Sequence, residues 1–113
     1  MDKILRINMG AEGGPKASDD GLGNYAGSGG RGLTSAIVSN EVPPLCHPLG
    51  EDNKLVIAPG LLSGSAAVQS GRISVGCKSP LTGGIKEANS GGATFTGTCQ
   101  NRVCRYYSGG KTF

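Results

Sequence analysis

The chain lacks tryptophan and is poor in other aromatic residues, and its shortages exclude several classes of protein. Aromatic side chains make up 4% of the 113 residues, which leaves little surface for stacking bases, so we expect no nucleic-acid partner. No apolar run approaches the roughly 20 residues that a membrane-spanning helix needs. The opening residues, Met1 to Lys3, do not resemble a signal-peptide core. The sequence therefore predicts a cytoplasmic chain with no membrane partner.

Metal-ligating residues are also scarce. His47 is the single histidine, and it stands beside Cys46 in a proline-flanked stretch with no carboxylate closer than Glu51. This pattern favours a loop residue over a metal ligand. The even number of cysteines is compatible with disulfides, but without a secretory signal we expect reduced thiols and assign no metal to Cys46, Cys77, Cys99 and Cys104.

Glycine is abundant, with 21 residues against a usual frequency of roughly 7%. The stretch from Lys54 to Gly92 is lined with glycine and serine, whose exposed backbone N–H groups can approach a ligand closely. Its hydroxyl groups have no acid-base partner at a recognisable spacing. The carboxylates are scattered among expected loops and form no obvious pair. This stretch is typical of a binding surface and shows no catalytic centre.

Periodicity predicts an α+β fold that is rich in sheet, with short helices and many glycine turns. Strands are expected where apolar residues alternate or form short runs, and Pro43-Pro44 should end a short helix. Residues 10–30 hold many glycines and no hydrophobic period, which indicates a loop. The expected strands are Lys3–Met9, with Leu5, Ile7 and Met9 on one face, Lys54–Ala58 and Arg72–Cys77; the expected helix is Leu33–Asn40.

Several short elements occur in a fixed order. They are GRGL at residues 30–33, EVPP at 41–44, PLG at 48–50, NKLVIAP at 53–59, GR at 71–72, KSPLTG at 78–83 and ANSGG at 88–92. In this order and spacing the chain resembles the N-terminal domain of the tungsten-containing aldehyde ferredoxin oxidoreductase family. The resemblance implies an incomplete domain of that type.

The resemblance also implies a function and a set of cofactors. Members of the family oxidise aldehydes to carboxylic acids with ferredoxin as electron acceptor. They use tungsten, or molybdenum, held by two pterins whose phosphates are linked by magnesium, together with an iron-sulfur cluster whose cysteine ligands lie in later domains. By resemblance, Arg72 lies between the pterin and the cluster, and the backbone carbonyl of Asn89 binds magnesium. Ser90, Gly91 and Gly92 complete the expected cofactor-binding turn, which we place at the start of a helix.

The last residues differ from the rest of the chain. Up to Gly97 the acidic residues balance Lys and Arg, so the net charge of +3 belongs to Arg102, Arg105 and Lys111. We therefore divide the chain into residues 1–97, a partial pterin-cradle domain, and residues 98–113, a tail foreign to the family. A back-translation of the tail, read with an offset of one nucleotide, gives LARIGYAAIIVEGKP, a helix followed by an apolar strand. This result predicts a shifted reading frame, and we expect residues 98–113 to be poorly packed and to add no native element to the fold.

The sequence thus leaves three functions open. The first is a piece of an oxidoreductase, inactive by itself, whose partners are the remainder of that enzyme and ferredoxin. The second is a non-catalytic subunit that offers the pterin cradle to a separate large chain. The third is a small anion-binding module without a redox role.

Overall fold

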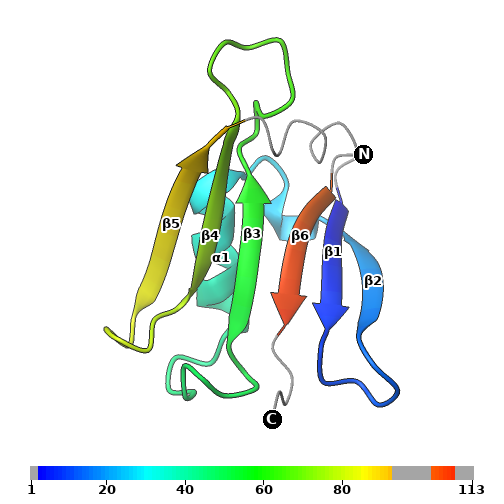
Figure 1. Ribbon diagram of the computed structural model, residues 1–113, viewed down its shortest axis with the longest axis vertical. Helices are drawn as coiled ribbons and strands as arrows, with labels where there is room; N and C mark the ends of the chain where they lie inside the picture. The colour runs from blue at the N-terminus through cyan, green and yellow to red at the C-terminus, as the bar shows by residue number, and fades with distance from the viewer. Residues whose placement is uncertain (1–2, 93–102, 109–113) are drawn as a thin grey trace.

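The fold is one sheet with a helix across one of its faces (Figure 1). The structure is a computed structural model and describes residues 3–92 and 103–108. Within these residues the helix α1 spans Gly30–Glu41 and a short 3-10 turn, η1, spans Gly23–Tyr25. The strands are β1 (Lys3–Asn8), β2 (Lys16–Gly21), β3 (Lys54–Pro59), β4 (Arg72–Lys78), β5 (Ile85–Gly91) and β6 (Val103–Ser108). This architecture confirms the expected sheet-rich α+β class.

The six strands lie in the order β2-β1-β6-β3-β4-β5. Neighbouring strands are antiparallel except β1 and β6, which run parallel. Strand β6 therefore connects two units that follow each other in sequence, the β1–β2 hairpin and the β3–β4–β5 meander. In the part of the chain that the structure describes, no helix is long and apolar enough to cross a membrane.

The core lies between α1 and the sheet. Leu33, Ile37 and Val38 of the helix are buried against Ile4 of β1 and against Val56 and Ala58 of β3. Strand β4 offers a small residue to the helix, because a Cβ built at Gly76 would stand 2.9 Å from the Thr34 Cβ. The helix ends at Glu41 because Pro43 and Pro44 cannot continue it.

The expected strands and helix are confirmed, with small differences at their ends. The helix begins at Gly30, earlier than the expected Leu33. The strands β3 and β4 continue through Pro59 and Lys78, each beyond its expected end.

The expected loop over residues 10–30 is wrong, because it contains β2 and η1. Every residue of β2 is exposed, so the strand has no apolar alternation for sequence reasoning to detect. Pairing with β1 orders it instead. The alternation in β1 is present, but the residue most deeply buried is Ile4, on the face opposite to Leu5, Ile7 and Met9.

The structure differs from expectation at two further places. Ala88–Gly91 belong to β5 and do not start a helix, since each pairs with a residue of β4; a helix after Gly92 would lie outside the described residues. Val103–Ser108, within the tail that was expected to add no element to the fold, form β6. Hydrogen bonding to β1 and β3 on its two edges accounts for that strand, although its sequence has no strand period.

Candidate cofactor site at the β4–β5 edge

The expected site residues meet where β4 begins and β5 ends. Arg72 pairs with Gly91 in the register of the two strands, and Asn89 pairs with Ser74. Since side chains alternate along a strand, positions 72, 89 and 91 share the face of the sheet that carries α1, and Ser90 lies on the other face. The structure therefore brings Arg72 and the Asn89–Gly92 segment together, but it divides the segment between the two faces.

Glycine allows the close backbone approach at this edge. The Gly92 N–H donates to the Gly71 carbonyl oxygen at 3.0 Å. A Cβ at Gly71 would stand 2.7 Å from the Gly92 oxygen, and Gly92 itself has φ of 140°, a conformation that other residues rarely adopt. The turn therefore requires glycine at both positions.

Ser63 holds the backbone of Arg72 in place. The Ser63 side chain is almost fully buried, and its Oγ lies 2.8 Å from the Ser70 carbonyl oxygen and 3.0 Å from the Arg72 carbonyl oxygen. The Gly60 N–H also donates to the Arg72 carbonyl, at 3.1 Å. These bonds close the loop between β3 and β4, which extends beyond the sheet in Figure 1.

The exposed Arg72 side chain has no hydrogen bond or ion pair within the described residues, so its guanidinium can bind an anion.

A cluster of polar side chains beside Asn89 was not expected from the sequence. The Glu87 carboxylate accepts from Arg31 Nε at 3.0 Å and from Ser74 Oγ at 2.7 Å, and it also contacts the Asn89 side-chain amide. Ser74 Oγ in turn lies 3.1 Å from Thr34 Oγ1, and both of these residues are fully buried. The cluster links α1 to β4 and β5. The only sequence signal was Arg31 in the GRGL element, because the partners are far apart in the chain.

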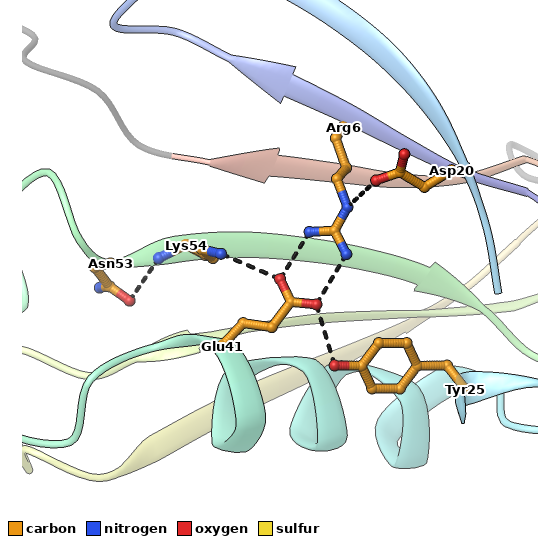
Figure 2. A network of polar contacts seen from close by, with 6 residues as sticks. All are labelled: Arg6, Asp20, Tyr25, Glu41, Asn53 and Lys54. Atoms are coloured by element: carbon orange, nitrogen blue, oxygen red, sulfur yellow. Dashed lines mark hydrogen bonds and ion pairs between the residues drawn. The ribbon is translucent and has the colours of Figure 1, made fainter. Parts of the chain in front are cut away.

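A second polar network lies at the other end of α1 (Figure 2). Arg6 donates two hydrogen bonds to the Glu41 carboxylate, at 2.7 and 2.9 Å, while Lys54 Nζ and the Tyr25 hydroxyl each donate at 3.1 Å. Arg6 also pairs with Asp20 of β2. Burial raises the pKa of Tyr25 above its usual value; the Asn40 hydrogen bond lowers it and the Glu41 carboxylate raises it. The network joins β1, β2, β3 and η1 to the helix, so its role is structural.

The histidine and the described cysteines, which the sequence offered as possible metal ligands, do not form a metal site among the described residues. His47 Nδ1 accepts from the Leu49 N–H at 3.2 Å, and the thiols of Cys46 and Cys77 are free. Among the residues that the structure describes, no group of three His, Cys, Asp or Glu could hold a metal ion.

The candidate site residues are open to solvent. Arg72 and Asn89–Gly92 are exposed, so a bound molecule would be open to solvent unless another surface covered it. Strand β5 is the edge of the sheet, and alternate N–H and C=O groups along an edge strand have no sheet partner. Such backbone groups, together with a guanidinium, suit a phosphate and a hard cation. The exposed groups at this edge therefore have the chemistry that a phosphate-bearing ligand requires on one of its sides.

Comparison with known proteins gives the family. Residues 4–99 match the family model described as aldehyde ferredoxin oxidoreductase, N-terminal domain. The chain belongs to this family of oxidoreductases. It is 50% identical over 64 residues to the tungsten-containing aldehyde ferredoxin oxidoreductase of Thermococcus kodakarensis, and 39% identical over 93 residues to that of Pyrococcus horikoshii. These matches cover 57% and 80% of the chain.

The relatives are much longer than this chain, which covers 11% and 15% of the two. Their name implies a tungsten cofactor in the complete enzyme. The fold is similar to part of a solved structure described as the active site complex BamBC of benzoyl coenzyme A reductase in complex with 1,5-dienoyl-CoA. The TM-score is 0.80 at 24% identity, over 95% of this chain and 16% of the other.

Proposed function

We propose that residues 1–97 form one wall of the metallopterin site of an oxidoreductase that converts aldehydes to carboxylic acids and passes the electrons to ferredoxin. The pairing of Arg72 with Gly91 carries the proposal, because it brings a guanidinium that has no hydrogen bond or ion pair among the described residues beside the glycine turn of the family's ANSGG element. The family match supports the same assignment.

The residues of this wall have separate roles in the proposal. The Arg72 guanidinium donates hydrogen bonds and offsets the negative charge between pterin and iron-sulfur cluster. The Asn89 carbonyl oxygen binds magnesium, and the backbone of Ser90, Gly91 and Gly92 lies against the pterin phosphate. When bound, a tungsten or molybdenum bis-pterin supplies the redox chemistry, and the remaining walls and the cluster ligands come from sequence beyond this chain.

A chimera tests the proposal. The segment of the P. horikoshii relative that aligns with this chain is replaced by the chain's own residues, and tungsten per protein is measured by elemental analysis. We expect Arg72→Ala to lower the tungsten content about tenfold or more, because a hydrogen bond to a charged group contributes roughly 1.5–3 kcal/mol. Lys16→Ala removes an exposed cation from β2, at the opposite edge of the sheet, and is the matched control. Equal tungsten content in the two variants would refute the role of Arg72.

The second candidate is a non-catalytic subunit that supplies the cradle to a separate large chain. One observation favours it: β6, from the tail, completes the sheet of this chain. The gene neighbourhood separates the two candidates. An adjacent downstream reading frame that encodes the rest of the oxidoreductase out of frame favours the enzyme piece, and a complete independent large-subunit gene favours the subunit.

A further inference from the structure

The helix α1 covers one face of the sheet, and β1, β3 and β4 also carry apolar residues on the other face (Figure 1). Ile4, Val56 and Ala58 point to the helix, and Ser74 bonds to its Thr34. Because side chains alternate along a strand, the neighbouring residues of β1, β3 and β4 point the other way. They form what we term the open face, whose aliphatic residues are Leu5, Ile7, Leu55, Ile57, Ile73 and Val75.

The composition of the open face is that of a buried surface. An antiparallel sheet with one solvated face normally carries polar residues there, whereas strands buried on both faces are apolar throughout. Leu55 is 44% exposed, Ile73 is buried, and the other four side chains are partly exposed. Register and alternation place Lys3, Asp19 and Lys86 around these apolar residues. Apart from position 105 of β6, the face has an apolar centre and a charged rim, which is the usual anatomy of a protein interface.

We propose that the open face docks against the part of the oxidoreductase chain that follows the N-terminal domain. The family match includes β1, β3 and β4, which carry the face. The chain covers only 11% to 15% of the relatives and 16% of the similar solved chain, so most of each of those proteins lies outside this domain. The proposal rests on the proposed function, in which this domain works together with that remainder.

The strand β6 lies between β1 and β3, so it separates Leu5 and Ile7 from the other apolar residues of the open face. Its Arg105 pairs in register with both Leu5 and Ile57. The tail read in the shifted frame has alanine at this position, so that reading would keep the apolar composition across the sheet. Docking and the shifted reading frame thus support each other, although each has its own test.

Thiol labelling tests the docking. Leu55→Cys places a thiol on the open face, and Leu81→Cys places one in a 93% exposed loop position as the matched control. Both variants are made in the 113-residue chain and in the P. horikoshii chimera, and maleimide labelling is followed peptide by peptide with mass spectrometry. We expect labelling at position 55 to slow about tenfold or more in the chimera, since burial protects a thiol, and labelling at position 81 to stay unchanged.

The outcomes distinguish docking from its alternatives. Equal labelling at position 55 in the isolated chain and the chimera would overturn the proposal. Protection already present in the isolated chain, together with a dimer by light scattering, would make a second copy the occupant and would overturn it equally. Tungsten content is measured on the same chimera. If position 55 is protected but Arg72→Ala leaves the tungsten content unchanged, the docking holds and the proposed function fails. The two failures can therefore be told apart.

Discussion

At the scale of residues, two largely buried carboxylates, Glu41 and Glu87, each have several polar partners. The Glu41 side chain is 18% exposed and lies against two cations and a phenol. Glu87 is 11% exposed and lies against Arg31, Ser74 and the Asn89 amide. Removing a partner from such a group leaves a charge poorly solvated, which costs more than the loss of an exposed ion pair. These two carboxylates fix α1 to the sheet near each of its ends.

Gly76 lets the helix approach the sheet, and its replacement should be destabilising. A methyl group at this position would meet Thr34 Cβ at 2.9 Å, so we expect Gly76→Ala to lower the free energy of unfolding by about 1–3 kcal/mol. Urea unfolding followed by circular dichroism measures the change. Gly32→Ala is the control, because the helical Gly32 has open space around its Cβ position and should gain up to about 1 kcal/mol. A Gly76→Ala variant as stable as the wild-type chain would contradict this packing.

We expect Tyr25 to make the stability of the folded chain depend on pH in the alkaline range. Its pKa is raised in the folded chain by burial, partly offset by Asn40 and reinforced by Glu41, so folding favours the neutral phenol. This contribution is fully present below the unfolded pKa of about 10 and is lost as pH rises through the higher folded value. We expect the wild-type chain to lose more stability than Tyr25→Phe between pH 9 and pH 11, two values chosen to bracket that pKa. Parallel pH profiles for the two proteins would show that Tyr25 does not cause the dependence.

At the scale of elements, β6 is the strand that makes one sheet out of two units. β1 bonds to β2 and β6, and β3 bonds to β4 and β6. Without β6, the remaining link between β1 and the meander would be the packing of Ile4 and the Arg6 bond at α1. An isolated two-stranded hairpin is marginally stable in water.

Truncation after Gly97 should therefore affect the two units unequally. We expect amide hydrogen exchange in β1 to accelerate at least about tenfold, while β4, paired on both edges, keeps more of its protection. The measurement is exchange with mass spectrometry on the 113-residue chain and the truncated one. Unchanged protection in β1 would mean that β6 contributes nothing to the sheet.

At the scale of the whole molecule, the proposed wall of the cofactor site and the open face are the two surfaces with a proposed function. Both features need a further surface: Arg72 and Asn89–Gly92 are exposed, and so is Leu55 on the other side of the sheet. An exposed wall must order its ligand with few contacts, and those contacts do not offset the entropy of ordering.

The isolated chain is accordingly expected to be inactive. The purified 113 residues should contain no stoichiometric tungsten or molybdenum by elemental analysis, and should not reduce a viologen dye when aldehyde is added. Stoichiometric metal together with aldehyde-dependent dye reduction would show a complete site and would contradict the one-wall description.

We also propose that residues 98–113 are read out of frame. The family match ends at Cys99, and in the shifted frame the six positions of β6 read YAAIIV, an apolar sequence suited to a strand paired on both edges. Resequencing the locus should reveal a one-nucleotide insertion or deletion near the codon for Thr98. An intact frame through Phe113 that also occurs in close relatives would refute this proposal.

The sequence by itself determined the family and most of the elements of the first 92 residues. Strands β1, β3 and β4 and the helix follow from local periodicity and from Pro43-Pro44, which act within a few residues. The ordered motifs also predicted that Arg72 and Asn89–Gly92 share a site; the β4–β5 register brings these residues together, and the shared site stays a proposal.

Only the tertiary structure decided which face of the sheet is covered and which further segments, β2 and β6, join the sheet as strands. Strand β2 is wholly exposed and β6 lacks a strand period, so pairing with distant neighbours determines both. Ile4 is buried in preference to Leu5 and Ile7 because α1 packs on its face of the sheet. The partners of Glu41 and Glu87 likewise come from separate elements. Periodicity reports which residues share a face, but long-range packing decides which face is buried.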